Sequence, residues 1–81
     1  MIARVIVTPK PVVNDPQGLT VKQGLASLGF RDVADVRVGK YIELRLRDVD
    51  PSAARTRTGV MCERLLANGV IEDFRVEVEE R

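Results

Sequence analysis

The dipeptide Asp-Pro occurs twice in the chain, at Asp15-Pro16 and Asp50-Pro51. Aspartate is a favoured helix N-cap, and proline suits the first helical position because its missing N–H would have no partner there. Each copy therefore predicts a helix start. Each also lies between segments with the alternating apolar pattern of strands. The two copies are 35 residues apart (50 − 15), so the chain divides into two β-α-β halves.

The first half begins with a β-branched run over residues 3–8, which is apolar on both faces and predicts a central strand. The helix that starts at Asp15 carries an apolar stripe of Val21, Leu25 and Leu28. Gly29 is placed to end it in a left-handed conformation, with the next residue folding back on the last turn.

The middle of the chain predicts a hairpin. Residues 33–38 are strand-like, with Val36 and Val38 on one face, and Gly39-Lys40 suits a two-residue type II′ turn. Residues 41–47 then alternate with three apolar side chains directed inward, namely Ile42, Leu44 and Leu46.

The second half repeats this arrangement. The helix from Asp50 ends near Asn68-Gly69, and residues 71–79 alternate as a last strand. Its expected buried side consists of Ala54, Thr58, Met61, Cys62, Leu65 and Leu66. The order β-α-β-β-α-β predicts an α+β, ferredoxin-like split βαβ fold in a single domain over residues 1–81, with a four-stranded antiparallel sheet and two helices on one face.

A chain of 81 residues is marginally stable alone, and its one cysteine excludes an internal disulfide. We therefore expect an oligomer. The net charge of +1 argues against nucleic acid or an anionic membrane as the partner. The N-terminal residues do not resemble a signal peptide, and one free cysteine fits a cytoplasmic protein.

The sequence offers few candidates for catalysis. Histidine is absent, which excludes the usual activated nucleophiles and most transition-metal sites. Cys62 falls on the expected core face of its helix, and the loop at Gly18 lacks the glycines and lysine of a phosphate-binding loop. Glu43 and Arg45 stand where an RNA-binding sheet would need aromatic side chains. We expect no catalytic, cofactor-binding or metal-binding residue, and no enzyme activity of the chain alone.

One alternative involves a small ligand. The stretch DPQGL at residues 15–19 is similar to the loop with which ACT regulatory domains hold an amino acid, although it has one extra residue between proline and glycine. ACT domains share the β-α-β-β-α-β order and dimerise. An amino-acid-binding regulatory domain therefore remains open as an alternative.

Four stretches together resemble the PurS family: KPVVNDPQG at 10–18, LASLGF at 25–30, DVRVGKYIEL at 35–44 and MCERLLANGVIEDFRVEVEE at 61–80. This resemblance implies the small subunit of phosphoribosylformylglycinamidine synthase in purine biosynthesis. It implies a homodimer, with a tetramer possible, that docks between a large synthetase subunit and a glutaminase subunit and assists ammonia transfer. The complex would use ATP, magnesium and glutamine, none of them bound by this chain.

The most family-like residues outside the expected core fall in three segments, and we expect these segments to contact partners. The first opens the first helix, the second surrounds the Gly39 turn, and the third precedes the last strand. The expected contact residues are Asp15, Pro16, Gln17, Gly18, Arg37, Gly39, Lys40, Asn68, Glu72 and Asp73.

Overall fold

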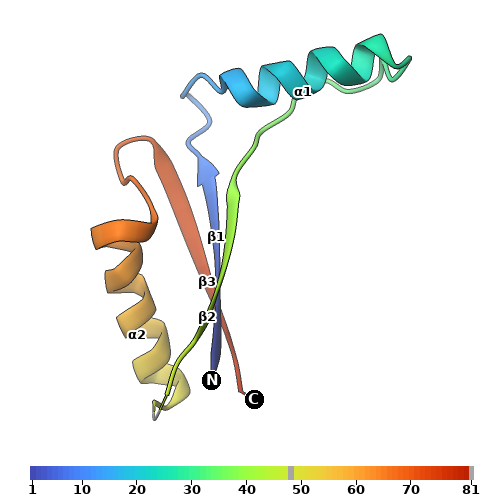
Figure 1. Cartoon of the computed structure of the whole chain (residues 1–81). Coiled ribbons are helices and arrows are strands. Elements are labelled where there is room, and N and C mark those ends of the chain that lie inside the picture. The colour runs from blue at the N-terminus through green and yellow to red at the C-terminus, as the bar shows by residue number, and fades with distance from the viewer. Residues whose placement is uncertain (48, 81) are drawn as a thin grey trace.

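The computed structural model describes residues 1–47 and 49–80. The chain forms β1 (Ile2–Pro9), α1 (Pro16–Ser27), β2 (Lys40–Arg45), α2 (Pro51–Met61), a π-helical turn η1 (Cys62–Leu66) and β3 (Glu72–Glu79). The sheet is antiparallel in the order β2-β1-β3, so β1 is the central strand, as predicted (Figure 1). In the described part of the chain, no helix is long and apolar enough to cross a membrane.

The prediction of a four-stranded ferredoxin-like sheet is wrong. The sheet has three strands, because residues 33–38 form no strand and the Gly39-Lys40 hairpin does not exist. The physical reason is register. A two-residue turn at this point would place Val38 opposite Tyr41 and Val36 opposite Glu43, and directly opposed residues share a face. The apolar sides of the two strands would then lie on opposite faces of the sheet.

The chain instead passes straight through Gly39 into β2. An ideal Cβ at Gly39 would lie 2.1 Å from the carbonyl oxygen of Val7, so only glycine lets the chain run this close to β1. The neighbouring Lys40 then pairs with Val7 as the first residue of β2.

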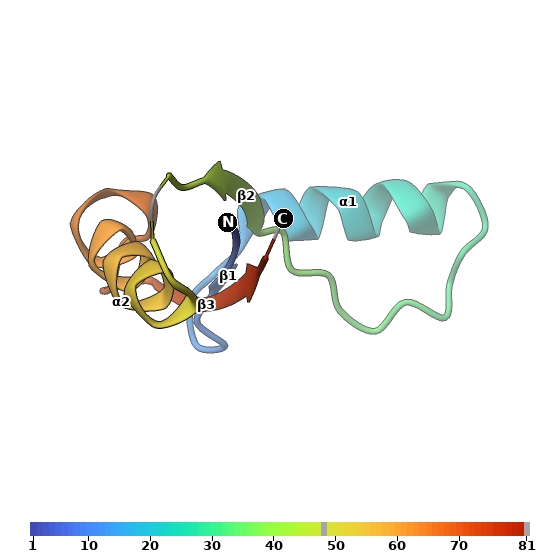
Figure 2. The same ribbon diagram turned by 90° about the horizontal axis from the view of Figure 1, so that it is seen from below.

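The expectation that both helices cover one face of the sheet is also wrong. In the described part of the chain α2 packs on the sheet, while α1 projects beyond it and residues 28–39 lead back from the far end of α1 to β2 (Figures 1 and 2). We call residues 10–39 the arm. The Cα radius of gyration is 15.9 Å, with extents of 49 × 27 × 14 Å. A compact domain of this length would have a radius of gyration of about 12 Å, so the arm makes the molecule markedly elongated.

The core lies between the sheet and α2. It centres on Val5, Val7 and Cys62, all fully buried, with half-buried side chains from β2, β3 and η1 packed around it. Ala54 and Thr58 of α2 are also fully buried, as predicted.

The expected burial of Leu65 is wrong, because this side chain is 84% exposed. A π-helical turn contains more residues than an α-helical turn, so η1 rotates the side chains that follow Met61 out of α-helical register. As a result Leu66, and not Leu65, packs against the core.

The local signals at the helix ends are confirmed. Asp15 and Asp50 cap the two helices by accepting hydrogen bonds from the N–H groups of Gly18 and Ala53. Gly29 has a φ of 99°. The N–H of Phe30 donates to the carbonyl of Leu25, and the N–H of Gly29 to that of Ala26, which together make the predicted Schellman ending.

The face of the sheet opposite α2 is polar. Arg4, at its centre, forms ion pairs with Glu79 and with Glu43, and Glu79 raises the pKa of the Arg4 guanidinium. Arg75 and Glu77 form a further pair at 3.4 Å. Neither α1 nor α2 covers this face (Figure 2).

Candidate partner-docking site

The three segments that hold the ten expected contact residues meet at one end of the molecule. The register of β1 shows why, since Val7 pairs with Lys40 while Thr8 and Pro9 pair with Asp73 and Glu72. The start of α1 follows β1 at the same end, away from both termini (Figure 1). We call this region the docking end.

Asp15 joins the start of α1 to the chain that returns from it. Its Oδ1 accepts the N–H of Gly18 at 2.9 Å, and its Oδ2 accepts the N–H of Val38 at 2.8 Å. These bonds, first that of Val38 and then that of Gly18, lower the pKa of the Asp15 carboxyl. We call this pair of bonds the clasp, and it fixes the direction in which α1 leaves the sheet.

Gly18 allows the clasp to close. An ideal Cβ at this residue would lie 2.2 Å from the carbonyl oxygen of Val36, a backbone atom that cannot move aside cheaply. The glycine is therefore required by close approach between the helix and the returning chain. It is the one buried residue of α1.

The third segment is tied to the same end by lysines. Lys10 Nζ lies 2.8 Å from Asp73 Oδ1, and Lys40 Nζ donates to the carbonyl of Leu66 at 3.1 Å and lies 3.8 Å from Glu72 Oε1. These are exposed or half-exposed contacts, each of which contributes little to stability alone.

Two backbone and side-chain contacts complete this network. Glu72 Oε1 accepts the N–H of Asn68 at 2.8 Å, and the guanidinium of Arg37 donates to the carbonyl of Lys10. The segments on either side of β1 are thus joined around its end. Gln17 is exposed, and its backbone is a further, smaller contributor to the lowered pKa of the Asp15 carboxyl.

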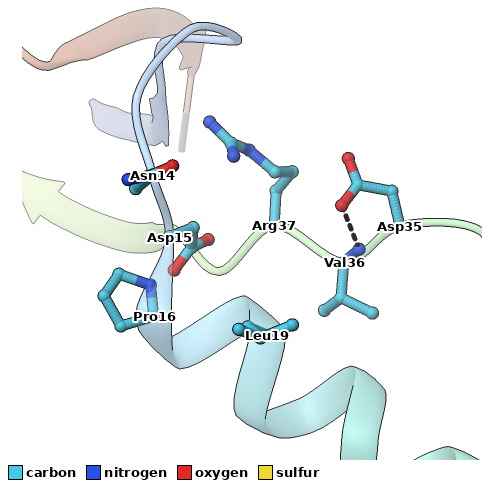
Figure 3. A pocket seen from close by; sticks show the side chains of 7 residues that line it. All are labelled: Asn14, Asp15, Pro16, Leu19, Asp35, Val36 and Arg37. Atoms are coloured by element: carbon cyan, nitrogen blue, oxygen red, sulfur yellow. Dashed lines mark hydrogen bonds between the residues drawn. The ribbon is translucent and has the colours of Figure 1, made fainter.

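A pocket of about 420 Å³ opens at the docking end between the start of α1 and the returning chain (Figure 3). The Oδ1 of Asp35 accepts the N–H of Val36 at 2.9 Å, and the Arg37 side chain stands at the rim. The lining residues are Asn14, Asp15, Pro16, Leu19, Asp35, Val36 and Arg37.

Four of these residues were not among the sequence-predicted contacts: Asn14, Leu19, Asp35 and Val36. Leu19 carried a signal that could have indicated it, since it is apolar but lies off the Val21–Leu25–Leu28 stripe. It is 54% exposed at the pocket. An exposed leucine beside an arginine and an amide suits contact with another protein.

The carboxylates of the docking end are engaged in contacts within the chain. The carboxylates of Asp15 and Asp35 accept backbone N–H groups, and Asp73 pairs with a lysine. Within residues 1–47 and 49–80, no group of three His, Cys, Asp or Glu side chains could hold a metal ion. Cys62 is buried elsewhere, and burial raises the pKa of its thiol, which disfavours the reactive thiolate.

Comparison with known proteins identifies the family. The PurS family, described as phosphoribosylformylglycinamidine (FGAM) synthase, matches residues 2–80. The PurS subunit of this synthase from Bacillus subtilis strain 168 is 48% identical over 81 residues, covering 95% of this chain and 90% of that protein. None of these matches supports the alternative of an amino-acid-binding regulatory domain.

Comparison with solved structures leads to the same family. The crystal structure of Methanocaldococcus jannaschii PurS has a TM-score of 0.88 at 34% identity, covering 99% of this chain and 96% of that one. It is described as one of the subunits of formylglycinamide ribonucleotide amidotransferase in the purine biosynthetic pathway. A chain in the structure of PurLQS from Thermotoga maritima has a TM-score of 0.82 at 30% identity, covering 94% of each chain. The protein therefore belongs to the PurS family and is a subunit of phosphoribosylformylglycinamidine synthase in purine biosynthesis.

Proposed function

We propose that this chain is the non-catalytic assembly subunit of its synthase. It works in the cytoplasm as a homodimer that holds a large synthetase subunit and a glutaminase subunit together and assists the passage of ammonia between them. The assembled enzyme is an ATP- and glutamine-dependent carbon–nitrogen ligase. ATP, magnesium and glutamine are bound by the other subunits.

The gathering of three distant segments at the docking end is the observation that carries this proposal. Residues 15–18, 37–40 and 68–73 are far apart in sequence. Pairing with β1 brings the second and third segments to the end of the sheet where β1 leads into the first. The polar groups there are engaged in holding the segments together. The surface that results is ordered and exposed, which suits recognition by another protein.

The pocket supplies the specific contact. Leu19 and Pro16 give it an apolar wall, and Arg37 gives it a guanidinium at the rim. An apolar side chain flanked by a carboxylate or a backbone carbonyl is the chemistry that such a pocket would take from a partner subunit. The solved PurLQS assembly from Thermotoga maritima, which contains a similar chain, also supports a role in assembly.

Reconstitution of the enzyme tests the proposal. Glutamine-dependent formation of the amidine product is measured with purified synthetase and glutaminase subunits while this chain is titrated in. We expect little glutamine-dependent activity without the chain and a saturable rise with it. Ammonia-dependent activity of the synthetase subunit serves as the internal control. Equal glutamine-dependent rates with and without the chain would refute an assembly role.

A matched pair of variants locates the contact. Arg37→Ala removes the guanidinium at the pocket rim, whereas Arg45→Ala removes an exposed arginine of β2, outside the docking end. We expect Arg37→Ala to raise the concentration of chain needed for half-maximal activity about tenfold, as for loss of one charged contact of ~1.4 kcal/mol. Arg45→Ala should leave that concentration unchanged. Equal effects of the two substitutions would remove the pocket from the interface.

A further inference from the structure

The turn between η1 and β3 contains the dipeptide Asn68-Gly69, which is not part of the pocket. In such a pair, the backbone nitrogen that follows the asparagine can attack the side-chain amide. Glycine offers the least obstruction to this attack, because it has no Cβ. The chain has two asparagines, Asn14 and Asn68, and both are exposed. Local geometry must therefore decide which of them is reactive.

The side chain of Asn68 is folded back onto its own turn. Its Oδ1 accepts the N–H of Val70 at 3.0 Å, which makes an Asx turn. This turn brings the side-chain amide back toward the intervening peptide bond, whose nitrogen belongs to Gly69. The N–H of Val70 also stabilises the negative charge that develops on Oδ1 when the amide carbon is attacked. The amide that would be attacked is thus held in place and activated.

The attacking nitrogen is unhindered. Within residues 1–47 and 49–80, the N–H of Gly69 donates no hydrogen bond, whereas the N–H groups of Asn68 and Val70 on either side of it are both engaged. Gly69 is exposed and Val70 is 81% exposed, so water can reach this nitrogen and its proton. An ideal Cβ at Gly69 would meet no atom beyond its chain neighbours within 4 Å, so the position is also open in space.

Asn14 carries the same amide in a different setting. The next residue is Asp15, whose side chain crowds the backbone nitrogen and whose carboxylate disfavours removal of the proton from it. The clasp also fixes Asp15 through its bonds to Gly18 and Val38. A fixed backbone opposes closure of a ring through that peptide bond. Asn14 is therefore an exposed internal control of low reactivity.

We propose that Asn68 deamidates at the docking end. The Gly69 nitrogen loses its proton to solvent and forms a bond to Asn68 Cγ. The bond from Cγ to the side-chain nitrogen breaks, and that nitrogen takes up a proton and leaves as ammonia. Water then opens the cyclic succinimide that remains. Opening at Cγ gives an aspartate in a normal chain, and opening at the main-chain carbonyl gives an isoaspartate. Nothing is oxidised or reduced, and water is the only co-reactant.

Either product alters the third segment of the docking end. A new carboxylate appears beside Glu72, whose Oε1 already accepts the N–H of Asn68 at 2.8 Å, and the two like charges repel. In the isoaspartate, the main-chain carbonyl of residue 68 becomes the free carboxylate. In the unmodified chain that carbonyl accepts the N–H groups of Ile71 and Glu72 at 3.1 and 2.7 Å, so the turn into β3 must change shape. On the proposed function, on which this step rests, the modified chain binds its partner more weakly.

Peptide mass spectrometry of the full chain after incubation at neutral and mildly alkaline pH tests the modification. We expect the mass change of NH2 replaced by OH at residue 68, formed faster at the higher pH, and none at Asn14. Gly69→Ala is the control, because its methyl group fits without strain: φ at this residue lies outside the left-handed range. It should slow the reaction about tenfold, or ~1.4 kcal/mol in the barrier. Equal rates in the two chains, a faster reaction at Asn14, or no reaction at Asn68 would overturn the proposal.

Reconstitution of the synthase tests the consequence. Each chain, with Gly or Ala at residue 69, is incubated and then compared with its own fresh sample. We expect the incubated natural chain to require a several-fold higher concentration for half-maximal glutamine-dependent activity, and the incubated Gly69→Ala chain to match its fresh sample. A fully modified natural chain that performs like the fresh one would refute the effect on binding. If the fresh chain itself gives no glutamine-dependent activity, the assembly role fails while the mass spectrometry still decides the modification.

Discussion

The packed half of the molecule and the arm are stabilised in different ways. In the packed half, β1 and α2 bury Val5, Val7 and Cys62 completely. In the arm, only Gly18 is fully buried, and α1 depends on a cap at one end, a Schellman motif at the other and the clasp. Isolated helices of 12 residues are marginal in water. The conformation of the arm is therefore specified by local interactions, but its apolar side chains become buried only when another surface covers them.

Substitutions that shorten a side chain in each region should produce the largest differences in the free energy of unfolding. Val5→Ala should lower the free energy of unfolding by about 2–3 kcal/mol, because it leaves a cavity in the core. Leu25→Ala in α1 should have an effect that depends on protein concentration, because the proposed homodimer would cover the apolar side of α1. Urea unfolding at two protein concentrations distinguishes them. Equal and concentration-independent losses would show that the arm is stabilised within one chain.

A second pair of substitutions distinguishes the contribution of the clasp to stability from that of helix propensity. Gly18→Ala places a methyl group against the carbonyl of Val36 and should cost about 1–3 kcal/mol of stability in the arm. Gly24→Ala, in the same helix, meets no atom within 4 Å and should stabilise α1 by about 0.5–1 kcal/mol. Amide hydrogen exchange in α1 and at Val38 reports both effects. Faster exchange in both variants would contradict the role of Gly18 in close approach.

A third substitution tests how much a buried polar atom in the packed half costs in stability. The hydroxyl of Thr58 is fully buried and has no hydrogen-bond partner among the residues that the structure describes. Thr58→Val should therefore raise the free energy of unfolding by about 1 kcal/mol. Thr56→Val, at an exposed position of the same helix, should change it by less than about 0.5 kcal/mol. A loss of stability in Thr58→Val would indicate that the hydroxyl is satisfied in solution.

The smallest effect is a pH dependence confined to the arm. The pKa of Asp15 is lower in the folded chain than in the unfolded chain, so the clasp contributes its full stabilisation above the unfolded pKa, about 3.9. That contribution is lost as the pH falls from there through the lower folded value. NMR titration should show the Gly18 and Val38 amide signals shifting in acid, and Asp15→Asn should abolish this transition. If amide signals throughout β1 shifted with the same pH midpoint, the transition would instead be global unfolding.

The parts of the structure that could be predicted are those decided by neighbouring residues. Asp15-Pro16, Asp50-Pro51 and Gly29 act within one helical turn, and the structure confirms all three. The predicted hairpin does not form, because the even-numbered alternation of apolar residues overrides the turn signal at Gly39-Lys40. Apolar positions fall on even numbers from Val36 to Leu46, which a two-residue turn would interrupt.

Other features depend on structure that no local pattern encodes. The exposure of Leu65 follows from a π-helical turn, whereas the apolar spacing there is that of an ordinary α-helical stripe. The three segments that hold the ten expected contact residues lie at one end of the molecule. Pairing with β1 places two of them there and the bond from Asp15 to Val38 ties in the third, and no single motif indicates either. Their contact with other subunits stays a prediction.

The pairing of Ile2 with Glu79 has a practical consequence. It brings the beginning of β1 beside the end of β3, at the end of the sheet opposite the clasp (Figure 1). A short linker could therefore join the two ends covalently without crossing the arm or the pocket. Circularly permuted chains opened between residues 31 and 34, and gene fusions made through either terminus, should keep the docking end and its pocket intact.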